Sequence, residues 1–250
     1  NINSPTHIEG GTTGLQINGA ASLISGNSLN NLSFSGQTGK YISLTDNALK
    51  GNITDATGTL FEGSTGAEKN ALQNFQTEDR IDHRSDNDSL GIIIVKSGNI
   101  FITQNSYVLP ETSAPSLQRG INAASDGYTV NIAAGIYNED LNINKRIEIT
   151  GENSGTVIRG LYGGNENTIQ ITTGDASLKK LTVTRDYGTG LSSWQTSTKK
   201  NGIYLSPNTS GIKIDNVNIR GNRNGISINN SQSSEITNCT IDSNYNGVVY

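Results

Sequence analysis

The feature that most constrains this chain is a 22-residue repeat in its last third. Residues 214–228 (IDNVNIRGNRNGISI) and residues 236–250 (ITNCTIDSNYNGVVY) align without a gap, with Ile on Ile, Asn on Asn and Gly on Gly. Such periods are typical of solenoids, in which each unit buries its apolar face against its neighbours. Short alternating runs (IKI, VNI, ISI), separated by Asn, Gly and Ser, predict three strands and three bends per period. One period therefore predicts one coil of a parallel β-helix, with coils about 4.8 Å apart.

The repeat register predicts which side chains point into the coils. The inward set should include Ile214, Val217, Ile219, Ile226 and Ile228, and Cys239 aligns with Val217, so we expect it to pack as a buried apolar residue.

The same register places Asn216 over Asn238 and Asn222 over Asn244, which predicts ladders of hydrogen-bonded amides. The last residues, NYNGVVY, make half a coil with an open strand edge. We therefore interpret the chain as a piece of something longer.

Composition narrows the classes of function. Hydrophobic residues are 32% of the chain and Gly contributes 29 positions, which suits a thin solenoid better than a broad core. A net charge of −4 gives no field that favours nucleic acid, and no apolar run reaches the length of a membrane helix. One Cys excludes an internal disulfide, and the abundance of Asn, Ser, Thr and Gly indicates a secreted or cell-surface location.

The chain divides into three expected domains. Residues 1–63 read as closing coils of a β-solenoid, and residues 116–250 as the start of a second one. Residues 64–115 read as a junction of helix, hairpin and Pro-bearing connection. There, Thr65 and Glu68 have the spacing of a capping box, which predicts a helix over residues 64–83 that covers a solenoid end through Leu72 and Phe75.

The entry into the second solenoid carries a family resemblance. AASDGYTVNIAAGIYNEDLNINK, at residues 123–145, resembles the entry coil of the right-handed parallel β-helix superfamily with the pectin-lyase-like fold. GTLFEG, TEDRIDH, LGIIIVKSGNIFIT and SAPSLQRGINAAS, in that order, resemble giant repetitive β-helix proteins on the surface of bacteria that use type IX secretion. The resemblance implies an all-β fold of right-handed parallel β-helix modules, and a surface-displayed, adhesive role.

No catalytic residues are expected. A lyase or hydrolase of this fold needs acids or bases clustered on one coil face. At the 22-residue step Asp215 meets Thr237 and Asp242 meets Arg220, so no carboxylates stack.

A ligand site is instead expected on the loop at residues 185–200, which breaks the coil rhythm and contains the single Trp. Tyr187 and Trp194 are expected to stack on sugar rings while Arg185 and Asp186 make polar contacts. The alternative is that Trp194 covers an apolar flank of the solenoid.

No metal site and no cofactor are expected. Asp79 and His83 share a helix face, but a charged helix end is normally solvated, and Ca²⁺ at the bends has no specific motif behind it.

These observations lead to a non-enzymatic structural or adhesive segment of a large secreted or cell-surface repeat protein, one that does not turn over pectin. Its expected partners are further repeats of the same chain and surface glycans or other cells. Two alternatives remain open: a fragment of a polysaccharide-acting lyase or hydrolase, and a carbohydrate-binding module.

Overall fold

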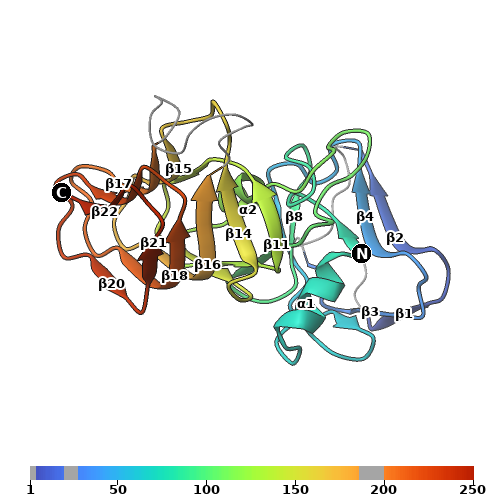
Figure 1. The fold of residues 1–250 in the computed structure, drawn as a ribbon. Coiled ribbons are helices and arrows are strands. Elements are labelled where there is room, and N and C mark those ends of the chain that lie inside the picture. The colour runs from blue at the N-terminus through green and yellow to red at the C-terminus, as the bar shows by residue number, and fades with distance from the viewer. Residues whose placement is uncertain (1–3, 20–27, 186–199) are drawn as a thin grey trace. The chain divides into compact units, whose positions relative to one another are not determined.

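A computed structural model describes residues 4–19, 28–185 and 200–250 (Figure 1). The chain forms two compact units, Asn1–Ala123 and Ala124–Tyr250, and each is described by itself. Strands in parallel ladders dominate both units, and the only helices among the described residues are two short ones. The predicted parallel β-helix architecture is thus confirmed. Neither helix is long and apolar enough to cross a membrane.

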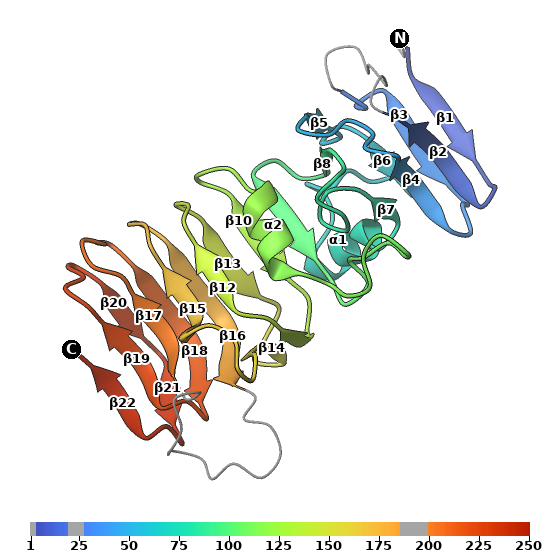
Figure 2. The ribbon, with the colours of Figure 1, turned by 90° about the horizontal axis from the view of Figure 1, so that it is seen from above.

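The second unit has three faces, each a ladder of parallel strands that contributes one strand per coil. The first face consists, in order, of β10 (Thr129–Ile132), β13 (Glu148–Gly151), the start of β16 (Ser177–Arg185), the start of β18 (Lys213–Arg220) and β20 (Glu235–Thr237). The second face consists of β11 (Gly135–Asn138), β14 (Thr156–Gly160), the ends of β16 and β18, and β21 (Thr240–Asp242), seen in a row in Figure 1. The third face consists of β12 (Leu141–Ile143), β15 (Asn167–Ile171), β17 (Asn201–Leu205), β19 (Asn224–Ile228) and β22 (Asn246–Val249) (Figure 2).

The 22-residue register is confirmed at the level of individual pairs. Ile214 pairs with Ile236 and Ile219 with Ile241. The expected inward set is buried at Ile214, Val217, Ile219 and Ile226, which form the core together with equivalent residues of earlier coils. Ile228 is only partly buried, because β22 pairs with β19 no further than Ser227.

One of the two predicted amide ladders is present. The backbone N–H and the Nδ2 group of Asn222 both donate to Asn244 Oδ1, at 2.9 and 3.2 Å. The Asn216 ladder was predicted wrongly: Asn238 Nδ2 donates to Asp215 Oδ1 at 2.8 Å instead. The physical reason is that Asn216 and Asn238 have φ of 53° and 52°, so they serve as left-handed bend residues.

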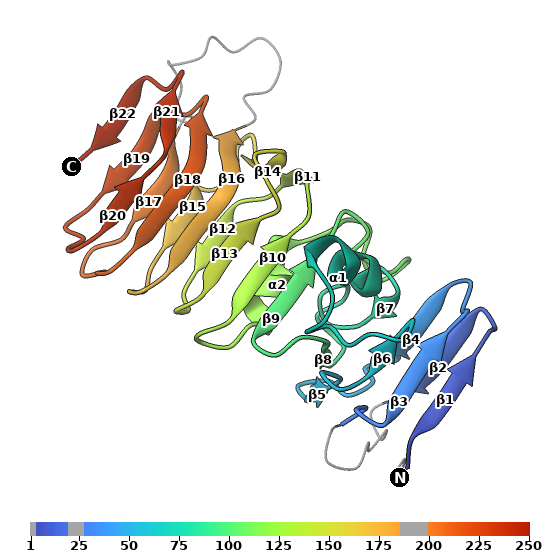
Figure 3. The same ribbon diagram turned by 90° about the horizontal axis from the view of Figure 1, so that it is seen from below.

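The first unit contains three shorter parallel ladders. One ladder consists of β1 (Thr6–Glu9), β3 (Leu32–Ser35) and β6 (Leu60–Phe61). Another consists of β2 (Thr13–Asn18), β4 (Lys40–Thr45) and β7 (Ile81–Asp82) (Figure 3). The third joins β5 (Ile53–Asp55) to β8 (Ile92–Ile94). The core of the first unit contains a cluster of three aromatic rings, Phe34, Tyr41 and Phe61, with ring centroids 5.2–6.0 Å apart.

The junction helix is shorter than expected and begins later. Helix α1 covers Ala71–Glu78, because Asn70 and Gln73 form the capping box, while Thr65 and Glu68 cap only the preceding turn. Phe75 is buried, as predicted, and its ring packs in a T-shaped arrangement with Phe101 of β9 (Asn99–Ile102), with the ring centroids 5.7 Å apart. Leu72 was predicted wrongly, since 56% of it is exposed.

The structure also differs from the hairpin expected in the junction, whose turn would lie at Ser97 and Gly98. A turn separates β8 from β9, with Asn99 N–H donating to Lys96 O. However, β8 is fully buried and extends the coil stack by pairing in parallel with β5, and no ladder among the described residues joins it to β9. The second helix of this unit, α2 (Leu117–Ala123), buries Leu117 and Ile121.

Candidate functional site

The loop expected to bind a glycan lies only partly among the described residues. Asp186, Tyr187 and Trp194 lie outside the described residues, so their role stays a prediction. Arg185, the last residue of β16, is described, and its side chain is fully buried. Its Nη1 donates to Leu161 O at 3.0 Å and its Nη2 lies 3.3 Å from Asp140 Oδ1. In this arrangement Arg185 supports the coil, and its part in binding a glycan stays a prediction.

Of the acids weighed as catalytic candidates on the coils, Asp215 is engaged with its neighbours. Thr237 Oγ1 and Asn238 Nδ2 both donate to Asp215, and these hydrogen bonds lower the pKa of that carboxyl. Asp242 is the backbone ladder partner of Arg220, as the register predicted.

The His83 side chain is also held by hydrogen bonds within the fold. Its Nδ1 accepts from the Ile93 N–H at 3.0 Å, so the ring hydrogen lies on Nε2, which donates to Glu78 Oε1 at 2.6 Å. Among the described residues, no three His, Cys, Asp or Glu side chains are grouped so as to hold a metal ion.

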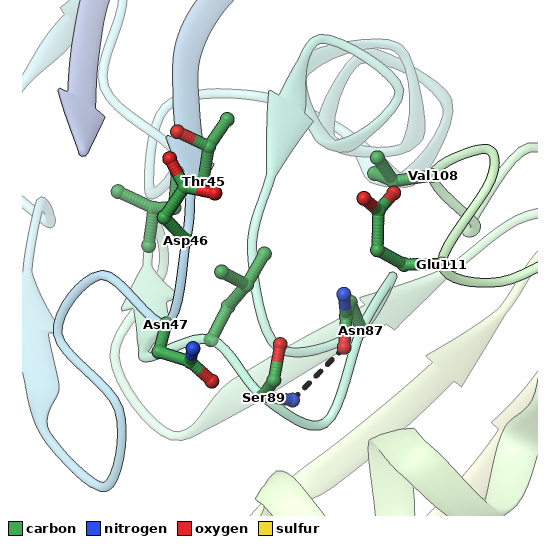
Figure 4. A pocket seen from close by; sticks show the side chains of 9 residues that line it. Thr45, Asp46, Asn47, Asn87, Ser89, Val108 and Glu111 are labelled. Atoms are coloured by element: carbon green, nitrogen blue, oxygen red, sulfur yellow. Dashed lines mark hydrogen bonds between the residues drawn. The ribbon is translucent and has the colours of Figure 1, made fainter. Parts of the chain in front are cut away.

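The most promising site is a hollow of about 200 Å³ in the first unit (Figure 4). Two of its walls are the segments that follow β4 and β7. Because these strands are paired in parallel, their carboxyl ends meet at one edge, the place where loops of stacked strands converge. The third wall is the turn at residues 108–112. Sequence periodicity gave no sign of this site, because its residues come from three bends with no common repeat.

Hydrogen bonds to backbone carbonyl groups fix the first and third walls. Asp46 and Asn47 have φ of 55° and 62°, a left-handed turn that Asp and Asn tolerate better than most residues. That turn is closed by Ala48 N–H donating to Thr45 O at 3.0 Å. On the third wall, Thr112 Oγ1 donates to Asp86 O at 2.7 Å, which ties this turn to the segment after β7.

The lining combines two carboxylates with amides and an apolar floor. Asp46 and Glu111 lie on opposite sides of the hollow, and Asn47, Asn87 and Ser89 lie between them along one side (Figure 4). Asn87 Oδ1 is oriented by the Ser89 N–H at 2.9 Å. Thr45 and the apolar residues Leu44, Leu90 and Val108 complete the lining. Carboxylates and amides match the hydroxyl groups of a sugar, and the apolar residues match its C–H faces.

A wider hollow beside α1 is less suited to a ligand, although it contains Lys69 and Arg80. The Arg80 guanidinium donates to the carbonyl oxygens of Gly39 and Gln37 and to Tyr41 Oη, and it stacks 3.8 Å above the Tyr41 ring. Burial raises the pKa of Tyr41 to about 12, while nearby Arg80 opposes the shift. Since Arg80 is thus occupied in holding the turn before β4, we do not assign a site there.

No protein-family model and no curated protein sequence matches this chain. Solved structures of pectin methylesterases do resemble it. Pectin methylesterase PemA from Erwinia chrysanthemi has 18% sequence identity and a TM-score of 0.41, covering 56% of this chain and 47% of that one. A pectin methylesterase mutant in complex with a hexasaccharide has 21% identity and a TM-score of 0.39, covering 50% of this chain and 44% of that one. The chain spans less than half the length of these proteins, and the likeness concerns the fold alone.

The comparisons bear out the resemblance to the right-handed parallel β-helix class, the pectin-lyase-like fold. They contradict the expectation of a non-enzymatic structural or adhesive segment, because the matching structures are those of enzymes. That interpretation was wrong and is not retained. The narrower resemblance to bacterial cell-surface repeat proteins stays a prediction.

Proposed function

We propose that this chain is part of a polysaccharide-acting enzyme, a glycoside hydrolase, and that a sugar unit of its substrate binds between Asp46 and Glu111. The observation that carries this proposal is the placement of two carboxylates on opposite sides of one polar hollow. Glycoside hydrolases use two such groups on either side of the scissile bond. The proposal includes an extracellular location, because a polymeric substrate is met outside the cell.

In the proposed reaction, one carboxyl group donates a proton to the glycosidic oxygen as its bond to the anomeric carbon breaks. The other carboxylate takes a proton from the attacking water, whose oxygen bonds to that carbon. Asn47 and Asn87 orient the sugar through hydrogen bonds to its hydroxyl groups. The product is a new reducing end.

The test is an assay of new reducing ends over a panel of neutral and acidic polysaccharides, with Asp46→Asn and Glu111→Gln as variants. Each substitution keeps the shape of the side chain and removes its acid–base chemistry. We expect activity to fall by about 100-fold or more in each variant. Asp88→Asn is the matched control, because Asp88 is an exposed carboxylate in the bend after β7 that does not line the hollow.

Two outcomes would remove the assignment. One is the absence of turnover on every polysaccharide of the panel together with no binding to any of them. The other is turnover that is equal in the wild-type chain and in both variants.

A further inference from the structure

A second cluster of reactive side chains lies on the first ladder of the first unit, where β1 pairs with β3. His7 is the ladder partner of Ser33, and Ser35 lies two residues further along β3 on the same outward face. The two ring nitrogens of His7 each meet one hydroxyl group: Nδ1 lies 2.8 Å from Ser33 Oγ, and Nε2 lies 3.2 Å from Ser35 Oγ. His7 is exposed and both serines are partly exposed, so the cluster is open to solvent.

The number of hydrogens on the His7 ring restricts how its two hydrogen bonds can be arranged. A neutral imidazole has one N–H donor and one acceptor nitrogen. With a hydroxyl at each nitrogen, one serine accepts from the ring and the other donates its O–H to it. In the tautomer with hydrogen on Nε2, Ser35 accepts and holds the ring, while Ser33 donates to Nδ1 over the shorter distance. This is the arrangement of a nucleophile, a base and an orienting group.

A place for a substrate adjoins these groups. His7 and Ser33 line a hollow of about 230 Å³ together with Asn30, Gly58 and Leu60. Its wall at Asn30 is fixed, because Nδ2 donates to Asp55 Oδ2 at 2.7 Å and Oδ1 accepts from the Gly58 N–H at 2.7 Å. Leu60 is 37% exposed and gives the hollow an apolar side. A small acyl group has the size and polarity to enter it.

We propose that Ser33 is a nucleophile toward small carboxylic esters of the acetyl type, with His7 as its general base and Ser35 as the positioning residue. Ser33 Oγ bonds to the ester carbonyl carbon, and its proton moves to His7 Nδ1. The bond to the leaving alcohol breaks, and that proton passes to the alcohol. Water then attacks the acyl carbon of acyl-Ser33 while His7 takes a proton from it. The bond between that carbon and Ser33 Oγ breaks, His7 returns the proton to Oγ, and the products are the carboxylic acid and free Ser33. This chemistry uses a different site and a different bond from the proposed glycoside hydrolysis, and does not depend on it.

The experiment treats the chain with p-nitrophenyl acetate, follows release of p-nitrophenol, and locates the acetyl group by mass spectrometry of peptides from acid-quenched samples. We expect acetyl on Ser33. Loss of the base should lower the rate by about 100-fold in His7→Gln, and Ser33→Ala should lose the adduct. Ser97→Ala is the matched control, since Ser97 is an exposed serine in a turn.

Ser35 is tested by a rescue. Ser35→Ala should lower the rate of acylation with the apparent affinity for the ester unchanged, and Ser35→Thr, which keeps the hydroxyl, should restore it. Thermal unfolding of each variant checks that the first unit is still folded. An acetyl group found on His7 in place of Ser33, or equal rates in the wild-type chain and His7→Gln, would overturn the proposal.

Discussion

The guanidinium of Arg185 lies 3.3 Å from the carboxylate of Asp140, with both side chains almost completely removed from solvent. The same carboxylate accepts hydrogen bonds from the Leu161 and Asn165 N–H groups, at 3.2 and 2.6 Å. Breaking a buried ion pair by removing one partner leaves the other charge without compensation in a medium of low dielectric constant. Asp140 therefore organises both the end of β16 and the bend after β14.

We expect Asp140→Ala to lower the free energy of unfolding by about 3–5 kcal/mol, measured by urea titration. Arg146→Ala is the control: Arg146 forms an ion pair with Asp126 at 3.0 Å in which both side chains are more than half exposed. Exposed pairs are screened by water, so the control should unfold almost like the parent. Equal effects in the two variants would show that the Asp140 pair is solvated.

The stability of the first unit should depend on Asp86. Burial raises the pKa of this carboxyl from 3.8 to about 7, and His83 opposes the shift. A raised pKa means that the folded state holds the proton more tightly than the unfolded state. This contribution is therefore complete below pH 3.8 and is lost as the pH rises through about 7.

Thermal unfolding across this pH window is the measurement. The midpoint temperature should fall as the pH rises, and the fall should be smaller in Asp86→Asn, which cannot ionise but can still accept from the His83 N–H. A parent and a variant with the same pH profile would contradict this assignment.

The third face contains an amide ladder that the repeat did not predict. Asn201 donates to Asn167, Asn224 to Asn201 and Asn246 to Asn224, over distances of 2.7 to 2.8 Å. Asn224→Ala leaves two neighbours without their amide partner, which should cost about 1–3 kcal/mol in chemical unfolding. Asn216→Gly should be nearly neutral, because Asn216 serves as a left-handed bend residue and Gly adopts that conformation readily. The reverse order of the two effects would mean that the ladders have been assigned to the wrong residues.

Burial of the coil interior can be tested with two isoleucines of the same unit. Ile219 is completely buried and Ile136 is 49% exposed. Ile219→Ala should lower the free energy of unfolding by about 2–5 kcal/mol, since it leaves a cavity between coils, and Ile136→Ala should have a much smaller effect. The register would be refuted if the two substitutions had equal effects in urea titration.

The repeat predicts the coil interior well, because the side chains that recur at a 22-residue step are those that stack. Ile214, Val217 and Ile219 follow from this alone, as does the contact between Asn222 and Asn244. The Asn216 ladder fails because a repeat shows that a residue type recurs but not whether it recurs for its amide or for its backbone conformation. The ladder from Asn167 to Asn246 was missed because its earlier steps are not 22 residues long: Asn167 and Asn201 are ladder partners, and so are Asn201 and Asn224.

The sequence pattern could not predict the candidate sites either, because their residues do not recur at the 22-residue step. Asp46 and Glu111 line one hollow only because a turn anchored by Thr112 brings a distant bend beside the end of β4. His7 and Ser33 meet through the register of two strands whose first-unit coils have no exact period. Leu72 was predicted wrongly because helical spacing identifies apolar positions on a helix but not which of them is buried. The contact between Phe75 and Phe101 decides which face of α1 is buried.

The stacking of coils in the second unit also has a mechanical consequence. Its backbone hydrogen bonds and amide ladders join one coil to the next, so they run along the stacking direction. Tension applied between residues 124 and 250 should load the outermost coil first and peel the unit open one coil at a time, because bonds aligned with the pull yield in sequence. Single-molecule stretching should record a series of steps, one of which releases the 22 residues that separate Lys213 from Glu235. A load applied across the strands would instead have to shear a whole ladder at once, so the unit should be soft along its length and stiff across it.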